Sequence, residues 1–291
     1  GNDQPGDANG SFEQVFYVDY EIVNKSDLTW YSPRFGIFMD PDIGPNYLND
    51  LVGTLENENM VYTYNGEENE DGFEIPPAVG VKVLGTKPGD FGGEHNLSVY
   101  AGGALCSSCL GDGLDTWDPD NDPRAYYRLN GLDNYGVPII NPNTGEQSLW
   151  QFDGDPTDGS GWIDNVLQDK RILISIASND IAPLDTIRFT ISVGVAAGWD
   201  GNNIQDANSS ITNLVSVMQQ AEEKWNNQFS AVTYVDRPII ERPWGDLFSF
   251  DFEAQEIGAS GYKDLSFINS GNLTANVNLS TASPNLSIEP A

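Results

Sequence analysis

The feature that most constrains the fold is a strict alternation of apolar and polar residues over short segments. Between residues 16 and 22, apolar side chains alternate with Tyr, Asp and Glu, and the segment 187–195 repeats this period of two. Such a period is typical of a β-strand with one buried face. Shorter apolar runs at 35–39, 172–176 and 247–252 are further candidate strands. The chain is therefore expected to be built mainly from strands.

The connections between these segments are rich in Gly, Pro, Asn and Asp, which are turn-forming residues. Many short strands with such turns predict an all-β fold, a β-sandwich of jelly-roll or immunoglobulin-like type. One segment departs from the pattern, because apolar residues recur at helical spacing between 206 and 229 without Gly or Pro. Ser209 or Ser210 could act as its N-cap. We predict one long α-helix near 207–229, packed against a sheet; a partner-binding helix is the rarer alternative.

The charge balance restricts the partners. With 13 Lys and Arg against 44 Asp and Glu, the formal net charge is 13 − 44 = −31. Such a chain repels phosphate backbones and anionic lipids, so we expect no nucleic-acid partner and no direct membrane insertion. Because 39% of the residues are hydrophobic and seven are Trp, a packed core is still expected. High salt or bound cations would relieve the repulsion.

Composition divides the chain into four parts. Residues 1–10 read as a flexible N-terminal segment without the features of a signal peptide, as in a mature or engineered start. Residues 11–235 form the main β-sandwich module, and residues 236–246 form a linker. Residues 247–291 hold about four candidate strands, fewer than the roughly seven of an immunoglobulin-like module. We therefore expect a partial module there, either in a fragment or in a sheet that a neighbouring chain completes.

Acidic residues gather in three loops bent by Gly or Pro. Carboxylates at alternate positions in such loops can direct several hard oxygens inward, as Ca²⁺ requires. None is an EF-hand: in the third loop Asp158 stands where the sharp turn needs Gly, and no Glu closes it. Simple surface turns are the alternative interpretation. The predicted metal ligands are Asp40, Asp42, Asn46 and Asp50; Asp118, Asp120 and Asp122; and Asp153, Asp155, Asp158 and Asp164.

The two cysteines, Cys106 and Cys109, lie in a glycine-rich segment with no helical pattern after them. A redox motif or a zinc site is therefore disfavoured, and a small disulfide in an oxidising compartment is favoured over two reduced thiols. The only histidine is His95, and nothing near it resembles a nucleophile elbow. Several Trp residues near polar loops could stack on sugars or anchor the core.

Nine short segments carry a resemblance to a known family: Tyr20–Ser26, Gly36–Gly44, Asn49–Gly53, Tyr62–Gly66, Ile75–Gly80, Phe152–Pro156, Gly159–Trp162, Asp169–Ser175 and Ile181–Thr186. These segments are similar to parts of large, secreted, multi-module surface proteins of Bacteroidetes-type bacteria that end in a type IX secretion sorting domain. The resemblance follows one order over roughly residues 12–229, and the segment from 247 resembles the first strands of an immunoglobulin-like module. The loop from Cys106 to Cys109 departs from the family pattern.

The resemblance implies a place at the cell surface or beyond, and it supplies no catalytic residues. Together with the acidic loops it predicts a non-enzymatic surface, adhesion or structural protein, including a filament-forming one, stabilised by Ca²⁺. Its expected partners are other modules of the same or neighbouring chains, glycans or cell-surface components. A carbohydrate-binding module or a glycan-active enzyme is the alternative function.

Overall fold

The computed structural model describes residues 14–68, 75–85, 97–106, 114–198 and 207–229, together with two short strands in the C-terminal part. The chain divides into two units, residues 1–233 and 234–291. Within the second unit, β9 (Ile240–Glu241) pairs antiparallel with β10 (Ile268–Asn269). The predicted N-terminal segment 1–10, linker 236–246 and partial module 247–291 lie largely or wholly outside the described residues and stay predictions.

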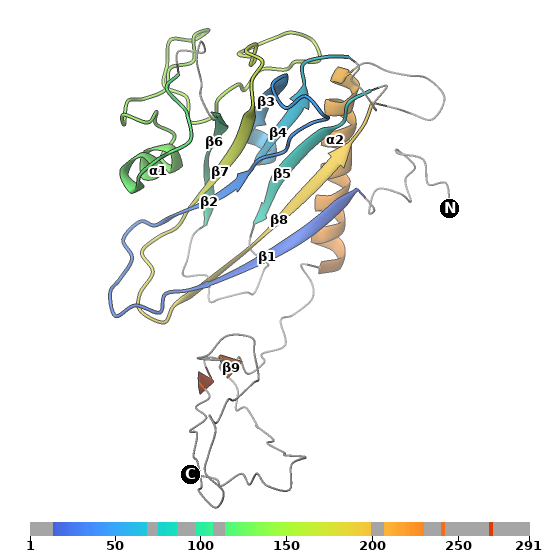
Figure 1. Ribbon diagram of the computed structural model, residues 1–291. Helices are drawn as coiled ribbons and strands as arrows, with labels where there is room; N and C mark the ends of the chain where they lie inside the picture. The colour runs from blue at the N-terminus through green and yellow to red at the C-terminus, as the bar shows by residue number, and fades with distance from the viewer. Residues whose placement is uncertain are drawn as a thin grey trace, which may run out of the picture. The chain divides into compact units, whose positions relative to one another are not determined.

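The first unit contains two antiparallel sheets, which confirms the predicted β-rich architecture (Figure 1). Its immunoglobulin-like or jelly-roll character stays a prediction. The five-stranded sheet has the order β1-β8-β5-β4-β3, and the three-stranded sheet has the order β2-β7-β6. The strands are β1 (Val15–Val23), β2 (Arg34–Met39), β3 (Asp50–Leu55), β4 (Met60–Asn65), β5 (Ala78–Gly85), β6 (Ser98–Cys106), β7 (Lys170–Ala177) and β8 (Thr186–Ala196).

The main core contains the inward faces of strands from both sheets. Ile172, Ile174 and Ile176 alternate along β7 and are each about 1% exposed, as the period of two predicts. Large aromatic residues of the long connection between β6 and β7 complete this core. Trp150 and Trp162 are buried there and therefore anchor the core, one of the two roles that the sequence left open.

Helix α2 (Ala207–Lys224) covers the other face of the five-stranded sheet (Figure 1), and a π-helical turn, Trp225–Phe229, follows it. The predicted helix is thus confirmed. Its buried residues include Ile211, Leu214, Met218 and Ala221, which pack on the sheet in one cluster. Gly194 of β8 permits the close approach, because a Cβ there would lie 2.5 Å from the Met218 sulfur.

Lys82 of β5 lies beneath this helix and is 1% exposed. Its Nζ is 2.5 Å from Glu58 of the short 3₁₀ helix η1 (Glu56–Glu58) and 2.6 Å from Glu222 of α2. Two carboxylates therefore compensate one buried ammonium group, and the ion pairs join the helix to the sheet.

A second helix, α1 (Asp122–Leu129), was not predicted from the sequence. Asn121 is its N-cap, since the side chain of Asn121 accepts a hydrogen bond from the backbone of Arg124 at 3.1 Å, and Pro lies in the first turn. The helix packs against β2 and β7 of the three-stranded sheet (Figure 1). Its eight residues follow a run of Asp and Pro that is typical of a loop.

Candidate functional site

Carboxylates from three separate segments meet at one end of the three-stranded sheet. In the register of β2 with β7, Met39 lies opposite Ile172, so Asp40 and Asp42 leave β2 beside the start of β7. Asp169 immediately precedes β7. The segment before α1 is held to the end of β6 by a hydrogen bond of 3.0 Å from the Asp118 backbone to the Cys106 carbonyl. Sheet register therefore gathers residues that are up to 129 positions apart in the sequence.

The guanidinium group of Arg171 lies at the centre of these carboxylates. Its Nε lies 3.2 Å from Asp40 and 3.4 Å from Asp118, and its Nη1 lies 3.1 Å from Asp169. The Arg171 side chain is 14% exposed, whereas those of Asp40 and Asp118 are about 40% exposed. One fixed cation thus faces several carboxylates at the edge of the protein. We call Asp40, Asp42, Asp118, Asp169 and Arg171 the Arg171 cluster.

Three members of the cluster satisfy a geometric condition for binding one metal ion. Asp40, Asp42 and Asp169 each offer a carboxylate oxygen, and these oxygens lie within 4.8 Å of one another. Two oxygens bound to one Ca²⁺ at about 2.4 Å can be separated by at most about 4.8 Å. The cluster carries four carboxylates and one guanidinium, a formal charge of −4 + 1 = −3. A divalent cation would reduce that charge to −1.

The carboxylates of the Arg171 cluster outnumber its single positive charge, and burial and this imbalance both act on the pKa values of Asp40, Asp118 and Arg171. Burial raises the pKa of Asp40, and Asp42, Asp169 and Asp118 raise it further, although Arg171 opposes them. The pKa of Asp118 is also raised, first by burial and then by Asp169. For Arg171, burial lowers the pKa, but the neighbouring carboxylates outweigh it and the net direction is upward. The anionic forms are therefore incompletely compensated by Arg171 alone.

The remaining predicted ligands of the first loop have other roles. Asn46 accepts a hydrogen bond from the Leu48 backbone at 3.4 Å. Asp50 is 0% exposed at the start of β3, and its Oδ2 accepts a hydrogen bond from the Ile43 backbone at 3.2 Å. These contacts shape the loop, while Asp40 and Asp42 reach the Arg171 cluster.

The second loop divides in the same way. Asp118 joins the cluster, and Asp120 instead pairs with Arg124 at 2.7 Å. Asp122 lies in the first turn of α1, where a negative charge favours the helix dipole. Of the predicted ligands Asp118, Asp120 and Asp122, only Asp118 therefore lies in the Arg171 cluster.

The third loop forms turns. Asp155 accepts hydrogen bonds from the Thr157 backbone at 2.8 Å and from its hydroxyl at 2.6 Å, and Asp158 accepts one from the Ser160 backbone at 2.9 Å. The Asp153 carboxylate accepts a hydrogen bond of 3.2 Å from the Asn141 side chain. These are the surface turns that the sequence offered as an alternative.

Asp164 lies apart from that turn, in the interior. Its side chain is 0% exposed and pairs with Lys170 at 3.0 Å. Burial raises its pKa, and Lys170 opposes the rise. Within the described ranges, no carboxylate of this third loop belongs to a group of three whose oxygens could share one ion.

Sequence reasoning missed Asp169 and Arg171 as members of the site. A signal for them exists, because Asp169, Lys170 and Arg171 are consecutive charges placed directly before the apolar strand 172–176. Alternation along a strand sends Lys170 and Arg171 to opposite faces. The outward residue is therefore free to meet the loops at the sheet end.

The cysteine prediction is only partly covered by the structure. Cys106 ends β6 and is 1% exposed. Cys109 lies outside the described residues, so the predicted pairing of the two stays a prediction. His95 and Trp199 also lie outside them.

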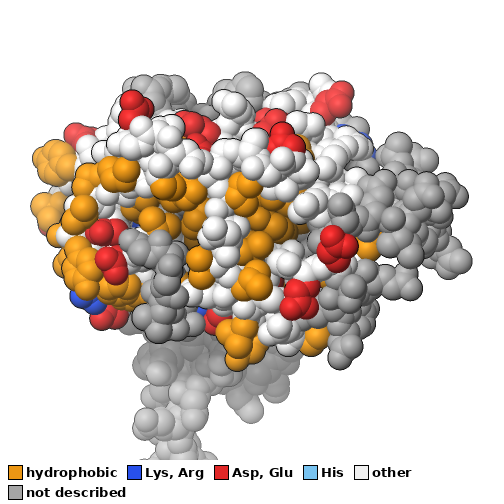
Figure 2. All heavy atoms as spheres, turned by 90° about the horizontal axis from the view of Figure 1, so that it is seen from above, with side chains coloured by type: hydrophobic (Ala, Val, Ile, Leu, Met, Phe, Trp, Pro, Cys, Tyr) orange, Lys and Arg blue, Asp and Glu red, His pale blue; other side chains and the backbone are white. Residues whose placement is uncertain are grey.

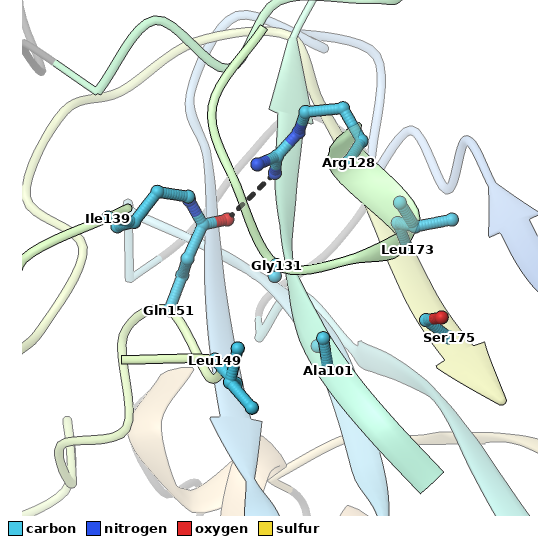
Figure 3. A pocket seen from close by; sticks show the side chains of 10 residues that line it. Ala101, Arg128, Gly131, Ile139, Leu149, Gln151, Leu173 and Ser175 are labelled. Carbon is cyan, nitrogen blue, oxygen red and sulfur yellow. Dashed lines mark hydrogen bonds between the residues drawn. The ribbon is translucent and has the colours of Figure 1, made fainter. Parts of the chain in front are cut away.

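A small cavity lies between α1, β6 and β7 (Figure 3). Its volume is about 10 Å³, which is room for about one water molecule and too small for a sugar. Figure 3 shows Arg128 and Gln151 pointing toward each other, with 3.2 Å between Nη2 and Oε1. Arg128 is 4% exposed and also donates to the carbonyls of Leu132 and Ala104. This contact network ties α1 to the sheet and is structural.

An aromatic pair, the half-buried Trp117 and the exposed Tyr135, adjoins the Arg171 cluster along the chain. Trp117 directly precedes Asp118, and its ring lies 5.5 Å from that of Tyr135 in an edge-to-face arrangement. Arg124 lies 5.6 Å from the centre of the Trp117 ring, and Tyr135 is 61% exposed. Such a pair offers an apolar surface with polar groups beside it.

Neither a scan against protein-family models nor a search of curated proteins finds a match to this chain. The resemblance to secreted surface proteins therefore stays a prediction. Among the helices that the structure describes, none combines the length and the apolar character that a bilayer crossing requires. Figure 2 shows acidic side chains distributed over one face of the molecule, with few Lys or Arg among them.

Proposed function

We propose that this chain is a non-enzymatic extracellular module of a multi-module surface protein, with a structural or adhesive role and stabilisation by Ca²⁺ at the Arg171 cluster. The observation that carries the calcium part is the convergence of Asp40, Asp42 and Asp169 within 4.8 Å. Three hard oxygens from two chain segments suit a Ca²⁺ ion, which accepts six to eight oxygen ligands with flexible geometry. Water would supply the rest of the coordination.

Two further observations support a cation at this place. The cluster keeps a formal charge of −3 after Arg171 is counted, and burial raises the pKa of both Asp40 and Asp118. In addition, Oδ1 of Asp118 is buried and receives no hydrogen bond from any described residue. A bound cation would relieve the repulsion among these carboxylates.

The surface location and the type IX secretion route rest on the sequence resemblance and on the acidic composition. A β-sandwich stabilised by calcium suits extracellular conditions, because calcium is abundant there. Extracellular modules bind calcium with dissociation constants of about 10⁻⁴–10⁻³ M. The proposed partners are neighbouring modules of the same or other chains and cell-surface components. Strand pairing by the C-terminal residues 247–291 is the proposed route to filaments.

A calcium melt tests the calcium part. Calcium at about 100 times its dissociation constant would stabilise the fold by about 2.7 kcal/mol. The melting temperature should therefore rise in calcium and fall after chelation with EDTA, and magnesium at equal concentration should have a weaker effect. Identical melting curves in calcium and in EDTA would refute calcium stabilisation.

Carbohydrate binding is the second candidate, and the exposed Tyr135 beside Trp117 favours it. Aromatic rings beside acidic and basic side chains are suited to stacking on sugar rings. A glycan array tests binding, and a polysaccharide-degradation screen tests turnover. Binding that Tyr135→Ala abolishes would establish a lectin-like module, turnover would establish an enzyme, and silence in both would favour the scaffold.

A further inference from the structure

A second charged pair lies on the inner side of the same strand. Lys170 begins β7 and shares the face of Ile172, which points into the core. Its Nζ lies 3.0 Å from Oδ2 and 3.3 Å from Oδ1 of Asp164. Both side chains are 0% exposed. The Phe152 ring lies 5.7 Å from the same nitrogen and covers the pair on one side.

Each oxygen of the Asp164 carboxyl group accepts a hydrogen bond from a backbone N–H group. The backbone N–H of Val52 donates to Oδ2 at 3.1 Å, and that of Val166 donates to Oδ1 at 3.2 Å. The carboxyl group therefore has a fixed plane, with the lysine nitrogen beside it. An N–H group directed at a carboxyl oxygen can also stabilise the negative charge which that oxygen carries in a tetrahedral intermediate.

We propose that Lys170 and Asp164 condense into an intramolecular isopeptide bond between Nζ and Cγ. One proton first passes from the ammonium group to the carboxylate within the pair, which gives a neutral amine and a neutral acid. The nitrogen lone pair then attacks Cγ, and the backbone N–H group that donates to the oxygen remaining on Cγ stabilises the negative charge of the intermediate. The C–O bond breaks, and the oxygen leaves as water with the acid proton and one proton from nitrogen.

Two physical conditions favour this step. The amine and the acid are held within hydrogen-bond distance, and such preorganisation in intramolecular reactions corresponds to effective concentrations of about 10⁵ M or more. The pair is also enclosed, so the product water is not replaced by bulk solvent that would reverse the reaction. The bond would close a ring over residues 164–170 and fix the start of β7 to the segment that precedes it. This inference does not depend on calcium binding or on the proposed surface location.

Lys82 provides a matched control inside the same protein. It is also a buried lysine with close carboxylates, but the side chains of Glu58 and Glu222 are 27% and 38% exposed. Solvent therefore reaches both partners of Lys82 and none of the Lys170 pair. The condensation should occur at Lys170 and not at Lys82.

Intact-mass spectrometry of the full chain under denaturing conditions tests the proposal. The mass should be about 18 Da, one water, below the mass calculated from the sequence, and tandem spectra should contain a branched peptide joining the two residues. Lys170→Met and Asp164→Ala should each restore the calculated mass, and Lys82→Met should retain the loss. The wild-type spectrum alone shows whether the chain has lost one water, so poor folding of a variant does not obscure this result.

Two results would overturn the inference. The first is a wild-type chain with the full calculated mass. The second is a loss of one water that persists in Lys170→Met, because Asp–Gly pairs such as Asp153–Gly154 can lose water by forming a cyclic imide without any lysine.

Discussion

Lys170 and Arg171 are neighbours on one strand, and they face opposite environments. Lys170 points into the core and meets one carboxylate, Asp164, with no solvent exposure on either side chain. Arg171 points outward, is 14% exposed, and meets the carboxylates of Asp40, Asp118 and Asp169. The ratio of cations to anions is therefore one to one inside and one to several outside.

This difference follows from the cost of an uncompensated charge. Inside the protein such a charge costs several kcal/mol, so an interior pair must balance. At the surface water and salt screen the excess, so the Arg171 cluster can keep a formal charge of −3. An excess that is tolerated in this way is also available to a cation from solution. The outer cluster is thus suited to bind a metal ion, whereas the inner pair is closed.

Removal of Lys170 should have the largest effect. Lys170→Met leaves the buried Asp164 without its cation, which should lower the free energy of unfolding by about 3–5 kcal/mol. Urea denaturation followed by Trp fluorescence measures this loss, and it is expected for both the ion-paired and the condensed form. The double variant Lys170→Met, Asp164→Leu should recover most of it. A loss below about 1 kcal/mol in the single variant would contradict the one-to-one rule for the interior.

Removal of Arg171 should have a smaller effect that depends on calcium. In EDTA, Arg171→Met should lower the free energy of unfolding by about 1–2 kcal/mol, because charged hydrogen bonds are lost at a partly exposed site. The cluster then carries −4, so calcium should stabilise the variant more than the wild type. Melting curves of both proteins in EDTA and in calcium measure the two increments. An equal calcium-induced rise in melting temperature in both proteins would mean that the cation site does not include the surroundings of Arg171.

The sequence predicts the fold better than the site. Alternation identifies strands such as 16–22 and 187–195, and helical spacing identifies 207–229, because burial of one face imposes a period that is visible locally. Strands such as Asp50–Leu55 and Met60–Asn65 were not singled out. They are covered on both faces or interrupted by Gly, so their alternation is weak.

The site depends on register, which is not local. Acidic loops are visible in the sequence, but the choice of Asp40, Asp42 and Asp118 over Asp120 and Asp122 is not. It follows from the pairing of β2 and β6 with β7, and from the eight-residue helix α1, which begins at Asp122 and whose Arg124 pairs with Asp120. An isolated loop carries no information about which neighbouring strand brings the missing carboxylate, here Asp169.

The pH dependence of stability should differ between the metal-free and calcium-bound cluster. A raised pKa of Asp40 and Asp118 means that the folded protein holds their protons more tightly than the unfolded chain does. In EDTA, their contribution to stability should therefore increase as pH falls from above the raised folded pKa toward the unfolded value of about 3.9. Asp40→Asn should be slightly more stable than the wild type at pH 7, and this difference should vanish near pH 4.

Calcium should reverse this trend, because protons and calcium compete for the same carboxylates. The calcium-induced rise in melting temperature should then shrink as pH falls through the raised pKa of Asp40. Melting curves at several pH values, with calcium or EDTA, measure it. A calcium increment that is constant between pH 7 and pH 4 would place the ion elsewhere.

The smallest stability effect is expected at Asp120, which forms a one-to-one pair at the surface. Its side chain is 64% exposed and its partner Arg124 lies four residues along the chain, so Asp120→Asn should lower stability by only about 0.3–0.5 kcal/mol. Asp42→Asn is the matched change within the cluster, with the same chemistry in an exposed loop. Only Asp42→Asn should weaken calcium binding in isothermal titration calorimetry, because Asp42 contributes one of the three close oxygens and Asp120 contributes none. Equal calcium affinities for the two variants would mean that general acidity, and not the Arg171 cluster, attracts the ion.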